Sequence, residues 1–361
     1  MSSAITYGDI SPRTAAYAVK DMLKRGMPYL CIEKFGQTYP MPTNATKVAK
    51  FRRYFLSGAT GAAGAGTASG SSGGANPAFY VPLATTALVE GVTPAGRNLA
   101  NQDYTVTLAQ YGDYTTISDV VMDTHEDPVL QQATDILGEQ AALTVETLRF
   151  NVLKAGTNAF YAAGTAGQVT TVRTSVVGPI NRPLQRKITT ALTRQNARPI
   201  TQVVSSTPNF RTEPVEAAFI GLVHPDCESD IRNMDGFIST KQYGTVTPFE
   251  NEIGSVERVR YLSSTVFAPW ADAGAATSGG TTYRSTSGTL WDVYPILYLA
   301  RDAYGIVPLK GKDALTPMVV NPKPAAGDPL AQRGTVGWKT MQASVILNEA
   351  WMARAEVTAT A

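Results

Sequence analysis

Residues 127–154 read DPVLQQATDILGEQAALTVETLRFNVLK, and this stretch is the strongest helix signal in the chain. Its apolar side chains recur at intervals of three and four residues, which is typical of one face of an α-helix. Asp127 can cap the start, Pro128 suits the first turn, and Gly156 follows the end. At ~1.5 Å per residue, the predicted helix would be about 42 Å long.

Extended segments lie on both sides of this helix. Before it, apolar and polar residues alternate over residues 46–56 and 104–118, and the phase shifts near Tyr111-Gly112, which suggests a bulge. Asp226 is expected to cap a short helix after an apolar strand. Further strands are predicted at 217–223, 256–263, 290–300, 304–309, 335–347 and 350–358, and further helices at 11–26 and 182–195.

Residues 57–76 contain only Ser, Gly, Ala, Thr and Asn, so this connection has almost no side chain to bury in a core. A structureless connection of such length usually has a purpose. An extended two-stranded loop that lies on a neighbouring molecule would explain it. An isolated two-stranded ribbon is marginal in water, so the neighbour would supply the stability.

Composition excludes several classes of protein. The chain has 361 residues with 31 basic and 29 acidic side chains, and a net charge of +2 argues against a protein that coats nucleic acid. Two cysteines and two histidines leave little for disulfide, metal or histidine-dependent catalytic chemistry, and their use favours a cytosolic chain. We therefore expect no metal and no cofactor. We also expect no membrane span, because no run of ~18 apolar residues occurs.

Charge is nevertheless segregated along the chain. The 66 residues from Thr147 to Thr212 carry nine basic and no acidic residues, so the remainder is 22 minus 29, or −7. Such segregation indicates either an electrostatic field that serves a function or two faces of opposite charge that meet. The nine residues are Arg149, Lys154, Arg173, Arg182, Arg186, Lys187, Arg194, Arg198 and Arg211.

A second basic group lies in the first predicted strand. Its members are Lys47, Lys50, Arg52 and Arg53, interleaved with Phe51, Tyr54 and Phe55. Basic and aromatic residues together suit stacking on a nucleic acid. Basic side chains on an exposed sheet edge, or paired with acidic groups of a neighbour, explain the pattern equally well.

Two short motifs suggest catalysis without the context that catalysis needs. Gly70-Ser71-Ser72-Gly73-Gly74 matches G-x-S-x-G, but no strand and helix flank it to hold Ser72 on a sharp turn. His224-Pro225-Asp226 is explained better as a turn between a strand and a helix.

Several short motifs occur in a fixed order. They are Lys50-Phe-Arg-Arg-Tyr54, Leu88-Val-Glu-Gly-Val-Thr-Pro-Ala-Gly96, Gln110-Tyr-Gly-Asp-Tyr114, Ile117-Ser-Asp119, Leu137-Gly-Glu-Gln-Ala141, His224-Pro-Asp226, Ile231-Arg-Asn233 and Glu252-Ile-Gly254. This ordered set resembles the major capsid proteins of tailed bacteriophages of the N-four type.

The resemblance implies an α+β chain with the Hong Kong 97-type capsid fold. The implied parts are an N-terminal arm (1–44), an extended loop or E-loop with its flanking strands (45–118), a peripheral domain (119–164) with the spine helix 127–154, an axial domain (165–330) and a C-terminal return to the peripheral domain (331–361).

The resemblance also implies a structural, non-enzymatic function. Copies would associate as hexamers and pentamers into the icosahedral head of a virion that encloses double-stranded DNA. Assembly would take place in the host bacterial cytoplasm, with a portal, a separate scaffolding protein and, in some phages, a decoration protein. Part of the segment with the nine basic residues would then face the DNA-filled interior or an acidic scaffold, or these residues would form ion pairs between subunits. The loop residues Lys47, Lys50, Arg52 and Arg53 would contact a neighbouring subunit. The alternatives are an encapsulin-like compartment of the same fold and a hydrolase that uses Ser72.

Overall fold

The computed structural model describes residues 30–42, 46–56, 87–93, 96, 98–119, 129–164, 167–201, 217–243, 247–277, 282–309, 316–320, 329–330 and 332–361. Some predictions lie outside these residues. They are the helix at 11–26, the shape of the loop at 57–76, the motif around Ser72, the capping by Asp127 and Pro128, and the position of Arg211.

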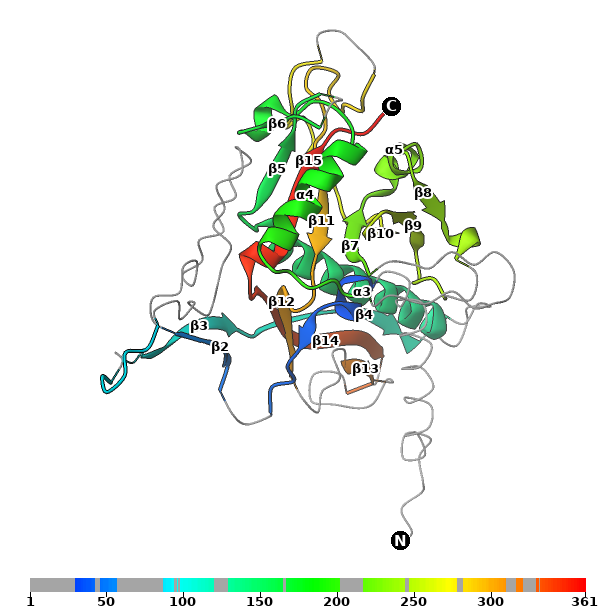
Figure 1. The fold of residues 1–361 in the computed structure, drawn as a ribbon. Coiled ribbons are helices and arrows are strands. Elements are labelled where there is room, and N and C mark those ends of the chain that lie inside the picture. The colour runs from blue at the N-terminus through cyan, green and yellow to red at the C-terminus, as the bar shows by residue number, and fades with distance from the viewer. Residues whose placement is uncertain are drawn as a thin grey trace.

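The predicted long helix is α3 (Val129–Lys154), and it lies across the middle of the molecule (Figure 1). Its first half packs on a five-stranded sheet through Leu137, Ala141 and the strand residues Ile117, Val336 and Trp338. The strands of this sheet are β1 (Gln37–Thr38), β4 (Ala109–Ser118), β12 (Tyr304–Pro308), β13 (Thr316–Val320) and β14 (Arg333–Ile346). β14 is the central strand, because β4 pairs with it along one side, and β12 and β13 share the other.

An eight-stranded sheet forms the other half of the body. Its order is β6 (Val169–Thr170), β5 (Ala159–Ala162), β15 (Met352–Val357), β11 (Tyr294–Leu299), β7 (Phe219–Val223), β10 (Val259–Ser263), β9 (Glu252–Val256) and β8 (Phe237–Ser239). Every residue of β7, β11 and β15 is buried, so helices and loops cover both faces of the sheet centre.

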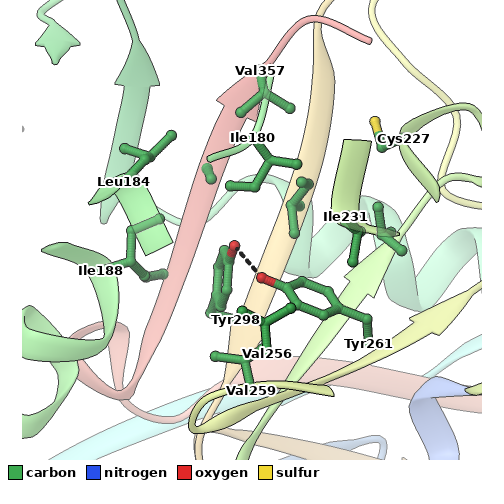
Figure 2. Packing of buried hydrophobic residues seen from close by; sticks show 14 of the residues in the cluster. Ile180, Leu184, Ile188, Cys227, Ile231, Val256, Val259, Tyr261, Tyr298 and Val357 are labelled. Atoms are coloured by element: carbon green, nitrogen blue, oxygen red, sulfur yellow. Dashed lines mark hydrogen bonds between the residues drawn. The ribbon is translucent and has the colours of Figure 1, made fainter. Parts of the chain in front are cut away.

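One face of this sheet is covered by α4 (Arg182–Arg194), whose Leu184, Ile188 and Leu192 are fully buried. Figure 2 shows this packing, with the hydroxyl groups of Tyr261 and Tyr298 at 3.1 Å from each other in the apolar core. The opposite face meets the end of α3 in a second cluster, which includes Phe150 and Leu153. The two sheets therefore share α3 as a common support.

The third sheet is a two-stranded ribbon of β2 (Val48–Leu56) and β3 (Leu99–Thr107), which projects from the body (Figure 1). The predicted strand 104–118 is in fact two strands, because β3 pairs with β2 and β4 pairs with β14. The break falls at the buried Leu108, whose N–H donates to Lys47 O at 2.9 Å. The predicted bulge at Tyr111-Gly112 is wrong, since the pairing of β4 with β14 continues unbroken through these residues.

Short elements complete the fold. They are α5 (Glu228–Arg232) and the 3-10 turns η3 (Ile32–Lys34), η4 (Arg173–Ser175), η5 (Pro225–Cys227), η6 (Thr240–Gln242) and η7 (Glu349–Trp351). The predicted cap by Asp226 is wrong. His224 caps η5, and Asp226 instead accepts a hydrogen bond from the Tyr294 hydroxyl at 2.7 Å. The segment 331–361 contributes β14 to one sheet and β15 to the other.

Candidate subunit interface

The ribbon has an inner half that rests on the body. Ala49 and Leu108 are buried in a cluster with Met41 and Val307. The Phe51 ring packs beside this cluster, with its centroid 5.9 Å from that of Tyr39 in an edge-on arrangement. These contacts fix the direction in which the ribbon leaves the body, so its outer half is presented to the surroundings at a defined angle.

The four predicted loop residues fall on different sides of the ribbon. Arg52 and Lys50 lie on the exposed face, where Arg52 donates to both carboxylate oxygens of Asp103 at 2.8 and 3.0 Å. Lys50 Nζ lies 3.3 Å from the same carboxylate. The hydrogen bond from Arg52 lowers the pKa of Asp103 to about 2, so the pair stays ionised across the physiological range.

Arg53 points the other way and lies over Trp351, with its guanidinium carbon 5.5 Å from the ring centroid. Lys47 is exposed at the root of the ribbon. The structure therefore uses Arg53 to hold the ribbon to the body, whereas Lys47, Lys50 and Arg52 are on surfaces that a neighbour can reach.

Apolar side chains are exposed along the outer part of this region. Tyr54 and Leu99 are 58% and 67% exposed on the ribbon. The turn at residues 87–93 carries three more, since Leu88, Val89 and Val92 are 77%, 67% and 62% exposed. In the sequence this turn is part of the motif Leu88–Gly96, and its apolar residues lie far from any predicted helix or strand that could bury them.

Most of the described basic residues of the 147–212 segment have partners within the subunit. Arg149 is almost completely buried on α3, where it donates to Glu33 at 2.9 Å and to Gln342 at 3.1 Å. Arg182 and Arg186 share Glu257, with Nε-to-Oε1 distances of 2.8 and 2.9 Å. Three of the nine basic residues therefore form ion pairs inside the subunit.

Lys154 and Arg173 meet at Trp270. The Arg173 guanidinium carbon lies 3.6 Å and the Lys154 ammonium 4.1 Å from the ring centroid. Arg173 also donates to both oxygens of the fully buried Glu356, at 2.6 and 2.9 Å. Burial lowers the pKa of Lys154, and the charges of Arg173 and Arg354 lower it further.

Three described basic residues of the segment are exposed and lie outside these ion pairs. Lys187 and Arg194 are exposed on α4, whose Leu184 and Ile188 are buried, and Arg198 follows the helix end. Arg301 extends this group, because its backbone N–H donates to Arg198 O at 2.9 Å and its side chain is 63% exposed. Among the eight described candidate residues, these three form one exposed basic strip, and Arg211 lies outside the described residues.

The candidate catalytic motif His224-Pro225-Asp226 forms the turn between β7 and α5. His224 Nδ1 accepts the Asp226 N–H at 3.3 Å, and burial lowers the pKa of His224. Cys31 and Cys227 are both buried as free thiols, and burial raises the pKa of Cys31 to about 11.

Within the described residues, no group of His, Cys, Asp and Glu has the geometry of a metal site. None of the described helices is both long and apolar enough to cross a membrane.

One contact of functional interest had no sequence signal. Glu146 on α3 is fully buried, and its Oε1 accepts the backbone N–H groups of Cys31 and Ile32 at 2.9 and 2.7 Å. An isolated glutamate in a long helix is ordinarily a solvated residue, so only the tertiary structure identifies it as an anchor for residues 31–35.

Comparisons with known proteins agree with this architecture. A capsid chain of Ralstonia phage GP4 matches with a TM-score of 0.58 at 14% identity, covering 90% of this chain and 87% of that chain. Chains from the capsids of cyanophages P-SCSP1u and Pam1 match with TM-scores of 0.55 and 0.53 at 15% and 12% identity. These matches cover 91% and 90% of this chain, and 88% of each of the other two. The predicted α+β fold of the Hong Kong 97 type is confirmed.

No curated protein sequence matches the chain. A protein-family model described as phage capsid protein, however, matches residues 101–355. The match runs from β3 of the ribbon through α3 to β15, and it leaves out η3, β1 and β2. The chain belongs to the phage capsid protein family and is a structural component of a viral shell.

Proposed function

We propose that this chain is the major shell subunit of a tailed bacteriophage, and that its copies form hexamers and pentamers in an icosahedral head around double-stranded DNA. The observation that supports this proposal is the ribbon of β2 and β3, whose inner half packs on the body while Tyr54 and Leu99 on its outer half are exposed. A two-stranded ribbon gains little stability alone. A second copy under the outer half would bury these side chains and stabilise both molecules.

Electron microscopy of the assembled protein tests the proposal. We expect closed shells with six-fold and five-fold clusters of subunits. A protein that stays monomeric at every concentration would contradict it. The contents of the shell separate two functions of this fold, because packaged DNA supports a phage head, whereas an interior filled with protein cargo would favour an encapsulin-like compartment.

The loop at residues 57–76 has a separate test. Deletion of these residues is expected to leave the subunit folded, since the segment lacks side chains that could form a core. Shell formation, or the temperature at which shells release DNA, is expected to fall. Deleted subunits whose shells form and withstand heat normally would show that the loop has no part in assembly.

The exposed basic strip of Lys187, Arg194 and Arg198 is proposed as the surface that meets a polyanion, either the packaged DNA or an acidic scaffold. Its contact with DNA would be non-specific, because the attraction is to the phosphate backbone. Mapping of the strip on an assembled shell checks this directly, since an outward-facing strip is incompatible with the proposal.

The remaining partners follow from the same proposal. A shell of this kind needs a portal through which DNA enters, and we propose a separate scaffolding protein and assembly in the host cytoplasm before the subunit becomes part of the virion. The proposed role is structural and non-enzymatic. A sensitive esterase assay on the purified protein, with Ser72→Ala as the control, would contradict it if activity appeared and was abolished in the variant.

A further inference from the structure

The indole ring of Trp270 gathers three cations from distant parts of the chain. Lys154 is the last residue of α3, Arg173 lies in η4, and Arg354 lies in β15. The Lys154 ammonium and the Arg173 guanidinium carbon are 4.1 and 3.6 Å from the ring centroid, and the Arg354 guanidinium carbon is 5.6 Å from it. The electron-rich face of an indole ring attracts cations. Trp270 therefore brings these positive charges together without cancelling any of them.

One carboxylate opposes the charge of this cluster. Glu356 accepts two hydrogen bonds from Arg173, at 2.6 and 2.9 Å, and its Oε1 lies 2.8 Å from Arg354 Nε. Among the residues that the structure describes, no other carboxylate lies within ion-pair distance of Lys154, Arg173 or Arg354. Three positive charges and one negative charge leave the cluster with a net charge of +2.

Two of the cations keep donors that no described residue accepts. Arg173 uses Nε and Nη2 on Glu356, which leaves the hydrogens of its Nη1 group. Lys154 donates one hydrogen bond, to Ala268 O at 3.3 Å, although an ammonium group has three donors. The Arg173 side chain is 33% exposed and Lys154 is half-buried, so an anion from solution can reach both.

Backbone and buried contacts hold the cluster in place. The Trp270 backbone pairs with that of Val293 through hydrogen bonds of 2.8 and 3.0 Å. Arg354 is almost completely buried, and its Nη1 donates to the carbonyl groups of Lys154 and Gly156 at the end of α3. The ring and the helix end are therefore fixed relative to each other. An anion would meet preformed positions, which keeps the entropic cost of binding small.

We propose that Lys154, Arg173 and Trp270 form a binding site for a phosphate group. A phosphate offers a tetrahedron of acceptor oxygens, and a phosphomonoester carries about −1.5 to −2 charge at neutral pH, so it suits a positive site with free donors on two separate elements. A carboxylate carries less charge and accepts in one plane. Two sources supply this chemistry, free phosphate and the backbone of DNA. The inference goes beyond the proposed function, because the site lies within one subunit and needs no neighbour.

Quenching of tryptophan fluorescence by iodide tests the site on disassembled subunits. Iodide is an anionic quencher, so a positive site that contains an indole ring concentrates it. Inorganic phosphate is expected to protect the subunit from iodide more strongly than chloride does at equal ionic strength. Trp270→Phe is expected to remove the phosphate-sensitive part of the quenching, because the other three tryptophans lie outside the site.

Lys154→Gln removes one charge from the site and keeps a donor for Ala268 O. Quenching of Trp270 by iodide is expected to fall about fivefold, as the loss of a unit charge at ~4 Å in water predicts, and protection by phosphate is expected to disappear. The matched control, Lys241→Gln, removes an exposed lysine and is expected to leave both unchanged. Quenching by neutral acrylamide shows whether the ring keeps its exposure, so a folding defect is distinguished from loss of the site.

A short DNA duplex distinguishes the two sources. Protection by both the duplex and inorganic phosphate assigns the site to the DNA backbone, whereas protection by inorganic phosphate alone assigns it to free phosphate, and either result supports a phosphate site. Phosphate that protects no better than chloride, or acetate that protects as well as phosphate, would overturn the inference. The proposed function would survive that result, because the formation of closed shells is measured separately.

Discussion

The carboxylate of Glu146 accepts the backbone N–H of Ile32 at 2.7 Å, and this contact joins the first described segment of the chain to the middle of α3. The same oxygen accepts the N–H of Cys31, and Tyr304 donates its hydroxyl to Ile32 O. The arm segment at residues 31–35 is therefore held from two elements at once. Since the contact is buried, its strength depends on whether Glu146 is ionised.

The first prediction is a pH dependence that disappears in Glu146→Gln. Burial raises the pKa of Glu146 to about 7, although the amides of Ile32 and Cys31 and the charge of Arg149 oppose the shift. The folded subunit thus binds a proton more tightly than the unfolded chain, in which the pKa is about 4.5. The tighter binding of this proton by Glu146 stabilises the folded subunit by on the order of 3 kcal/mol. This contribution is complete below pH ~4.5 and disappears as the pH rises through ~7.

Thermal unfolding of disassembled subunits between pH 5 and pH 8 measures this effect. The wild-type midpoint is expected to fall more steeply with rising pH than that of Glu146→Gln, which keeps an acceptor for both amides. Parallel curves for the two proteins would show that Glu146 does not titrate in this range.

A second prediction concerns the buried Glu356, which pairs with Arg173 and lies 2.8 Å from Arg354 Nε. Glu356→Gln leaves the almost completely buried Arg354 without its carboxylate, and we expect a loss of about 3–5 kcal/mol in unfolding free energy. Glu257→Gln breaks the more exposed pairs with Arg182 and Arg186 and is expected to cost less than about 1 kcal/mol. Denaturant unfolding of both variants measures the difference, and equal losses would contradict this account.

The main features of the fold follow from patterns in the sequence. The three-and-four spacing predicts α3 to within two residues at its start, and the apolar face of 182–195 predicts α4. The alternating segments mark the strands because burial on a sheet imposes a period of two. The break at Leu108 was missed, because a strand that changes partners keeps its alternation on both sides of the change.

The basic residues could not be assigned from sequence, because their partners lie far along the chain. Arg173 pairs with Glu356 and Arg149 with Glu33, separations of 183 and 116 residues. A segment without acidic residues therefore looks like one positive region in the sequence, although four of its described basic residues form ion pairs in the fold. Tertiary structure alone distinguishes Lys187, Arg194 and Arg198 from the rest.

A third prediction separates the root of the ribbon from its outer half. Phe51 packs at the root, close to Gly305 and edge-on to Tyr39, so Phe51→Ala is expected to destabilise the isolated subunit by about 1.5–3 kcal/mol. Tyr54 is 58% exposed, so Tyr54→Ala is expected to change the subunit's stability by less than about 0.5 kcal/mol. In assembled shells Tyr54→Ala is expected to lower the temperature of disruption. Calorimetry of subunits and shells checks both, and a destabilised Tyr54→Ala subunit would contradict the division.

The last prediction concerns the exposed basic strip. Replacement of Lys187, Arg194 and Arg198 by Gln is expected to leave unfolding free energy within about 1 kcal/mol of the wild type, because all three side chains are exposed. Binding of the subunit to double-stranded DNA should weaken, and the slope of log K against log salt should fall by up to about 0.9 for each DNA phosphate that the variant no longer neutralises.

The matched control replaces Arg182 and Arg186, which share the carboxylate of Glu257, by Gln. Since Glu257 offsets one of these two positive charges, the control changes should alter the salt slope less than the strip changes do. A control that weakens DNA binding as strongly as the strip variant would mean that attraction depends on the total charge of the segment rather than on the exposed strip.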